Sequence, residues 1–210
     1  YSSLSDYRLR EPAEYAEYYE ALKYATDKGS TVIISAGNED ADVGIHLPLP
    51  AAFSSEIDGV ISVAAVANTG DISSYSNYGS LVTIAAPGGD DNGNDGSAII
   101  STAPNSSYEE LQGTSMASPV VAGAAALIKA VNPRLRPNDI ENILTNSADK
   151  YRALSTLVED GNYLNLKAAV SLAQTYEPTP EPYDGIIESV SGKGKLKGTK
   201  VADAFTFDSF

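Results

Sequence analysis

The most constraining feature of the sequence is a run of small apolar residues from 115 to 131, SMASPVVAGAAALIKAV. A helix that is apolar nearly all round is normally buried in a protein core. Pro119 is compatible with this helix because it falls in the first turn, where a missing backbone N–H breaks no hydrogen bond. The run therefore predicts a long helix packed inside the fold.

Three short runs of β-branched and small residues predict strands, at 31–35, 59–66 and 81–87. None of them alternates between apolar and polar residues. Strands of this kind are buried on both faces, as in a parallel sheet whose two sides are covered by helices.

Other segments have the spacing of amphipathic helices. The predicted helices, with their apolar stripes where one stands out, are 11–28 (Ala16, Tyr19, Leu22), 137–148 (Ile140, Ile143, Leu144) and 165–174. A hairpin is predicted around the turn PNSS, with strands at 98–102 and 108–113. This order of elements predicts an α/β fold of three layers, with a mostly parallel sheet and helices on both faces.

Composition excludes several classes of function. The net charge is −14 and the pI is about 4.3, so the surface repels nucleic acids and anionic membranes. The chain has no cysteine, which excludes disulfides, thiolate zinc sites and cysteine nucleophiles. No uninterrupted run of about 18 apolar residues predicts a membrane span.

The chain divides into three expected parts. Residues 1–175 are long enough for one domain with a core, 176–185 form a Pro-rich linker, and 186–210 begin a C-terminal extension. The first residues, YSSLSDYRLR, show neither an initiator Met nor a signal-peptide pattern. We therefore expect the chain to be part of a longer protein.

Ser115 follows Gly113 and Thr114 at the start of the predicted buried helix. Its hydroxyl can face solvent there, and its backbone N–H is one of the orphan donors of the first turn. The helix dipole adds partial positive charge at the same point. These features suit a nucleophile whose attack creates an oxyanion beside it. A serine or threonine before a helix is also common as an N-cap, so the position alone leaves both interpretations open.

A resemblance in the surrounding sequence favours the nucleophile over the N-cap as the role of Ser115. GTSMASPVVAGAAALI (113–128) closely resembles the serine motif of the subtilase family of serine endopeptidases, and VIISAGNED (32–40) resembles the family's strand and loop ending in the oxyanion-hole asparagine. Taken alone, Gly37–Asn38 would be a common turn. The likeness covers roughly residues 11–175 and implies a subtilisin-like fold whose N-terminal portion is missing here.

The resemblance also implies roles for individual residues. Ser115 would attack the peptide carbonyl, and Asn38 with the Ser115 N–H would bind the oxyanion. Ser35, Ala36 and Gly37 match the segment that lines the wall of the substrate side-chain pocket. Next to that wall, Glu39 would favour a basic substrate residue, or would be a solvated surface charge.

The family's catalytic Asp and His motifs precede the asparagine block, and neither is present in this sequence. The only histidine is His46, which lacks a Gly-rich helical context and follows Asn38 rather than preceding it. We therefore expect the Asp and His to come from an N-terminal part of the same catalytic domain, and this chain alone to be nearly inactive.

Two weaker patterns concern metal binding and export. GGDDNGNDG (88–96) is rich in oxygen donors, so a structural calcium ion is conceivable, although the spacing is not that of an EF-hand; the chemistry itself requires no cofactor. LKGTKVADAFTFDSF (196–210) resembles the edge of calcium-binding repeat modules of secreted bacterial proteins, and a strand pair packed on the domain is an equal alternative. We expect an extracellular or cell-surface bacterial protein.

Three functions follow from these observations. The first is a serine endopeptidase that cleaves protein or peptide substrates. The second is an inactive relative that keeps the fold only to bind peptides. The third is an intracellular processing protease of the same family, which the tail disfavours because calcium-bound modules need millimolar calcium.

Overall fold

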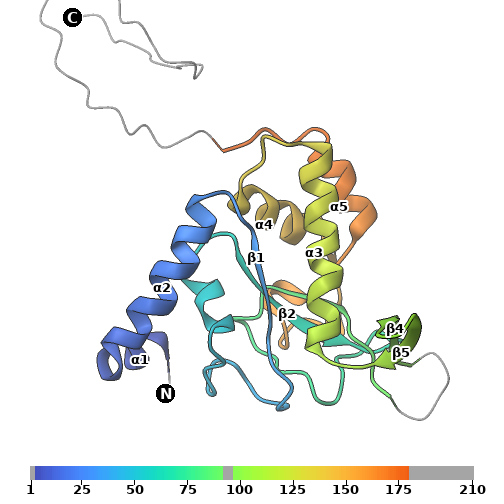
Figure 1. The fold of residues 1–210 in the computed structure, drawn as a ribbon, viewed down its shortest axis with the longest axis horizontal. Coiled ribbons are helices and arrows are strands. Elements are labelled where there is room, and N and C mark those ends of the chain that lie inside the picture. The colour runs from blue at the N-terminus through green and yellow to red at the C-terminus, as the bar shows by residue number, and fades with distance from the viewer. Residues whose placement is uncertain (1–2, 92–96, 180–210) are drawn as a thin grey trace, which may run out of the picture. The chain divides into compact units, whose positions relative to one another are not determined.

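The computed structural model describes residues 3–91 and 97–179. In chain order the elements are α1 (Leu4–Arg10), α2 (Pro12–Asp27), β1 (Val32–Ser35), the 3-10 helix η1 (Ala51–Ser55), β2 (Val60–Val66), β3 (Ile84–Pro87), β4 (Ile99–Ala103), β5 (Ser107–Leu111), α3 (Thr114–Val131), α4 (Pro137–Asn146), β6 (Asp149–Lys150), η2 (Arg152–Leu154), η3 (Glu159–Gly161), β7 (Asn162–Tyr163) and α5 (Leu166–Ala173). All the helices and strands predicted between residues 11 and 174 are present (Figure 1), whereas the alternative strand pair at 196–210 lies outside the described residues.

The main sheet has five strands in the order β1-β2-β3-β7-β6. The first four are parallel, and only β6 runs antiparallel to its neighbour. Alternate residues of β1 and β2 belong to different hydrophobic clusters, one on each face of the sheet. Ile61, Val63 and Ala65 pack with α3, α4 and α5, whereas Val32, Ile34 and Val60 pack with α1, α2 and η1. Helices therefore cover both faces, and the predicted three-layer α/β fold is confirmed.

Two strand predictions need correction. β2 is buried along its whole length, as expected, but β1 is only half-buried. β1 is the end strand of the sheet, so one of its edges has no neighbour among the described residues. β3 begins at Ile84 rather than at 81, because residues 79–82 form a turn closed by a hydrogen bond from the Val82 N–H to the Gly79 carbonyl.

α3 is buried on one stripe rather than all round. Its buried side chains are Thr114, Ala117, Val121, Ala124, Ala125 and Ile128. The opposite face is apolar as well, and it includes Val120, Leu127 and Val131, which are 38%, 49% and 40% exposed. By length and composition alone α3 could cross a membrane, but here its stripe packs on the sheet as a core helix.

The other helices also turn one stripe inward. In α4 the predicted residues Ile140, Ile143 and Leu144 are buried. In α2 the buried positions are Tyr15 and Thr26, whereas Ala16 is exposed. Tyr15 stacks on Tyr19 and packs against η1, so large aromatic side chains take the inward face.

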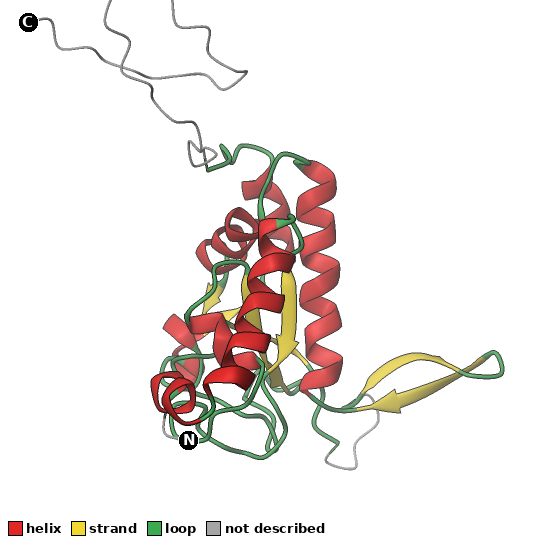
Figure 2. Cartoon of the chain, turned by 60° about the vertical axis from the view of Figure 1, so that its left-hand side comes forward, coloured by secondary structure: helices red, strands yellow, loops and turns green. Residues whose placement is uncertain are grey.

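The β4–β5 hairpin extends away from the sheet (Figure 2). Residues 176–179 of the predicted linker lie beside α3 and α4, where the Tyr176 carbonyl accepts a hydrogen bond from Asn132 and the Thr179 N–H donates to Asp139. The remaining linker residues and the predicted extension lie outside the described residues, so the proposed division of the chain stays a prediction.

Glu141 joins α4 to the turn before β2. The Gly59 N–H donates to Oε2 of Glu141 at 2.6 Å. Burial is the largest cause of a pKa of about 7 for Glu141; the Gly59 hydrogen bond opposes the rise, and the negative charges of Asp58 and Glu159 add to it. The folded protein therefore binds this proton more tightly than the unfolded chain does.

The raised pKa of Glu141 predicts that the stability of the fold depends on pH, and that Glu141→Gln removes this dependence. A carboxyl with a raised folded-state pKa stabilises the fold fully below about pH 4.5, and this contribution is lost as the pH rises through about 7. Between pH 5 and pH 8 the free energy of unfolding should fall by about 2 kcal/mol more in the wild type than in the glutamine variant. Urea unfolding of both proteins at the two pH values measures the difference, and equal falls would refute it.

Candidate active site

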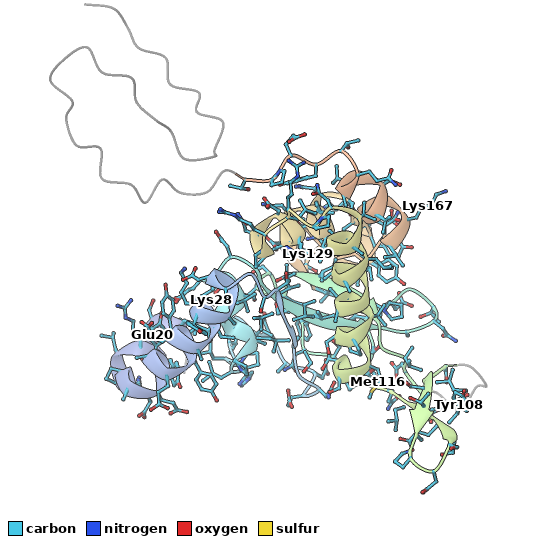
Figure 3. The ribbon with its side chains drawn as sticks, turned by 45° about the horizontal axis from the view of Figure 1, so that its top comes forward. Glu20, Lys28, Tyr108, Met116, Lys129 and Lys167 are labelled. Atoms are coloured by element: carbon cyan, nitrogen blue, oxygen red, sulfur yellow. The ribbon has the colours of Figure 1, made fainter. Side chains whose placement is uncertain are left out.

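The candidate site lies at the carboxyl ends of the parallel strands, where α/β sheets bind ligands. β1 ends at Ser35 and the chain continues into the loop that holds Asn38. α3 starts beside the same loop, and Met116 marks its first turn in Figure 3, at the end opposite Lys129. Asn38 and Ser115 are both exposed.

Hydrogen bonds join the Asn38 loop to the start of α3. Oδ1 of Asn38 accepts from the backbone N–H and from the hydroxyl of Thr114, each at 2.9 Å. The Thr114 hydroxyl in turn accepts from the Gly37 N–H at 3.3 Å. Residues more than 70 positions apart in the sequence are therefore held together, and Asn38 is hydrogen-bonded to Thr114, the residue that precedes Ser115.

The same contacts fix how the Asn38 carboxamide is turned. A backbone N–H can only donate, so the atom facing Thr114 N must be the oxygen of Asn38. Its Nδ2 is then left without a partner among the described residues, as is the N–H of Ser115. A carboxamide donor from the Asn38 loop and an orphan helix donor are thus both found at the start of α3, and donors of this kind suit the binding of an anion.

Ser115 is not the N-cap of α3, so capping does not account for a serine at this position. The N-cap residue of α3 is Gly113, at φ 149°, and neither Thr114 nor Ser115 makes a side-chain capping bond. The first N–H of the helix is satisfied instead by Asn38, which comes from another part of the chain. The Ser115 hydroxyl makes no hydrogen bond within residues 3–91 and 97–179.

The three residues predicted to line a substrate pocket differ in their placement. Ser35 and Gly37 are half-buried, and the side chain of Ala36 is fully buried in a cluster with Val43 and Val66. The whole of Ala36 is 0% exposed, its N–H donates to the Val63 carbonyl and its carbonyl accepts from Nδ2 of Asn77, so Ala36 presents no free group to a ligand.

A cavity of about 480 Å³ opens beside the Asn38 loop. Its lining residues are Glu39, Ala41, Ile45, His46, Leu47, Pro48 and Asn77. The wall of the cavity mixes apolar and polar groups, and the polar ones include one carboxylate and one imidazole. His46 follows Asn38 in the loop and makes no side-chain hydrogen bond to a described residue, so the structure gives it no link to Ser115.

Sequence reasoning missed Thr114 and Asn77. Thr114 lies within the serine motif, so its place between two predicted site residues was the signal that could have identified it. Asn77 lies 36 to 41 residues from its partners, and its carboxamide is buried against the Asn38 loop. Nearby, burial raises the pKa of Tyr75, whose hydroxyl donates to the carbonyls of Gly88 and Gly89.

The structure shows no calcium site among the described residues, and the expectation of a structural calcium ion stays a prediction. Both carboxylate oxygens of Asp90 already accept hydrogen bonds from Ser74. No cluster of three histidine or acidic side chains occurs in the described part of the chain. Most of the donor-rich segment 88–96 that motivated this expectation, residues 92–96, lies outside the described residues.

The chain is similar to proteins of one family. Residues 3–172 match the model of the Subtilase family. Thermitase of Thermoactinomyces vulgaris is 40% identical over 150 residues, which are 71% of this chain and 47% of thermitase. An extracellular protease of Xanthomonas campestris pv. campestris is 38% identical over 164 residues, 73% of this chain and 25% of that protein.

Solved structures share the fold. A protease from Pseudoalteromonas arctica superposes with a TM-score of 0.63 at 35% identity, covering 73% of this chain and 46% of that one. The A-subunit of the AB5 toxin from E. coli gives 0.63 at 28% identity, over 76% and 56% of the two chains. The chain thus spans about a quarter to a half of the curated relatives described here.

Proposed function

The chain belongs to the subtilase family of serine endopeptidases, and from that premise we propose that it carries the nucleophile and the oxyanion-binding half of a peptidase active site. The observation that supports this most is the pair of 2.9 Å hydrogen bonds from Thr114 to Oδ1 of Asn38. They leave the amide nitrogen of Asn38 as a donor beside the start of α3.

In the proposed mechanism Oγ of Ser115 attacks the carbonyl carbon of the scissile peptide bond. A histidine takes the hydroxyl proton and later gives it to the leaving amine, and an aspartate orients that histidine. The carbonyl oxygen becomes negative as the tetrahedral intermediate forms. Nδ2 of Asn38 and the N–H of Ser115 then donate hydrogen bonds to it, assisted by the dipole of α3.

The histidine and aspartate are proposed to come from an N-terminal part of the same catalytic domain. Two surfaces support this partner. β1 is the end strand of the parallel sheet and is only half-buried. α3 exposes an apolar face that includes Val120, Leu127 and Val131. A parallel strand and a helix covering these surfaces would complete the sheet and the core.

The proposed substrate is a protein or peptide. The cavity beside Asn38 would accept a side chain next to the scissile bond, and Glu39 on its wall would favour a basic one. Export is proposed as well, since one relative is an extracellular protease. A structural calcium ion remains an expectation from the family resemblance alone.

Labelling with a fluorophosphonate tests the proposal. This probe reacts with an activated serine nucleophile, so the protein with its upstream part should be modified at Ser115, as identified by peptide mass spectrometry. Labelling should disappear after unfolding in urea, because it depends on the assembled site. If the folded protein carries the upstream Asp and His and is not modified, the peptide-binding function is favoured over catalysis.

A further inference from the structure

Asn77 is a buried asparagine, 2% exposed. Its carboxamide makes all of its hydrogen bonds to residues 36–41, the loop that holds Asn38. Its Oδ1 accepts from the backbone N–H groups of Glu39 and Ala41, each at 3.0 Å. Its Nδ2 donates to the Ala36 carbonyl at 2.9 Å and to Oε2 of Glu39 at 2.7 Å. These four bonds reach both sides of Asn38.

The backbone of Asn77 also lies directly against this loop. Its N–H donates to the Gly37 carbonyl at 3.0 Å. A Cβ at position 37 would lie 2.3 Å from Nδ2 of Asn77, and Gly37 has φ +105°. Only glycine therefore allows the close approach, and the loop conformation and the asparagine require each other.

The segment that carries Asn77 is itself fixed to the sheet. The hydroxyl of Ser76 accepts from the Ala65 N–H in β2 at 2.9 Å and donates to the Asn77 carbonyl at 2.9 Å. The Tyr75 carbonyl accepts from the Asp40 N–H at 2.9 Å. The Asn38 loop is thus bonded through Asn77 to a buried strand.

We propose that Asn77 is the positioning residue of the oxyanion site. It would hold residues 36–41 so that Nδ2 of Asn38 and the N–H of Ser115 converge on one point. The proposal rests on the function proposed above, because the position of Asn38 matters only if it binds an oxyanion. A misplacement of about 1 Å at such a site can cost about 10²-fold in rate.

The test is steady-state hydrolysis of a peptide anilide by the protein with its upstream part. We expect Asn77→Ala to lower kcat by about 10–100-fold, with KM changed by less than about threefold. Asn162→Ala is the matched control. Asn162 is also buried, with 1% of its surface exposed, and its Nδ2 donates to the Thr83 carbonyl. Thr83 precedes β3, at the opposite end of the sheet from the site, so this variant should lose stability but not kcat.

A second variant covers the case in which Asn77→Ala does not fold. Asn77→Asp keeps the acceptor for Glu39 and Ala41 but turns an oxygen toward the Ala36 carbonyl and the Glu39 carboxylate. We expect a similar loss of kcat. Adding Glu39→Gln supplies an amide donor opposite the new carboxylate, so the double variant should have a higher kcat than Asn77→Asp alone.

Amide hydrogen exchange supplies a readout that needs no activity. The N–H groups of Glu39 and Ala41 should exchange faster in Asn77→Ala than in the wild type and in Asn162→Ala. Wild-type kcat in folded Asn77 variants, or unchanged exchange at these two amides, overturns the role of Asn77 alone. A wild-type protein that neither cleaves peptides nor labels at Ser115 overturns the proposed function, and the positioning role with it.

Discussion

Replacing Ser115 by alanine should abolish peptide hydrolysis by the protein with its upstream part, lowering kcat by about 10⁶-fold. This magnitude is that of subtilisin itself and is adopted here through the family relationship. The loss is expected because the hydroxyl is the bond-forming atom, and neither the oxyanion donors nor substrate binding can replace it. Residual turnover should come only from positioning and electrostatic stabilisation.

Active-site titration and initial rates on a peptide anilide measure this effect. Ser171→Ala is a suitable control, since Ser171 is an exposed serine on α5 whose hydroxyl donates to the Lys167 carbonyl. The free energy of unfolding should change little in Ser115→Ala, because Ser115 is exposed and its hydroxyl has no hydrogen bond to another described residue. Retention of more than a tenth of the wild-type kcat would rule out Ser115 as the nucleophile.

Replacing Asn38 by alanine should lower kcat by about 10²–10³-fold, a range taken from the corresponding asparagine of subtilisin. KM should change little. The donor acts on charge that develops only in the transition state, so its loss reduces kcat and kcat/KM together. This variant should also lose stability by about 1 kcal/mol, because the first N–H of α3 loses its acceptor.

Asn38→Asp separates the two effects. Aspartate keeps an oxygen to accept from Thr114, so the link to α3 remains, but it has no Nδ2 donor and brings a negative charge. We expect Asn38→Asp to lose at least as much kcat as Asn38→Ala while retaining more stability. Asn142→Ala is the control, an exposed asparagine on α4. If Asn38→Asp kept wild-type kcat, a donor role for Asn38 would be excluded.

Local sequence patterns predicted most of the fold because they depend on neighbours along the chain. The unalternating run at 59–66 became the fully buried β2, and the stripe of Ile140, Ile143 and Leu144 became the inner face of α4. The errors came from tertiary position. The sequence of β1 resembles a central strand, but β1 lies at the end of the sheet. α3 is apolar all round, but only one stripe of it meets the sheet.

The candidate site was only partly predictable, because it also depends on contacts between residues that are far apart in the sequence. Ser115 and Asn38 could be predicted as site residues because each lies in a long recognisable motif. Which atom of Asn38 faces α3 depends on Thr114, and the conformation of the loop depends on Asn77, 39 residues beyond Asn38 in the sequence. No local pattern links those residues, since only the folding of 73–78 against β2 brings them together.

The most direct test of the shared oxyanion site is a crystal structure of the protein with its upstream part, bound to a peptide boronic acid. We expect a tetrahedral boronate on Oγ of Ser115, with one boronate oxygen about 2.7–3.1 Å from both Nδ2 of Asn38 and the N–H of Ser115. A boronate on Ser115 whose oxygens all lie beyond hydrogen-bonding distance of Nδ2 of Asn38 would contradict the account, and so would a boronate bound elsewhere.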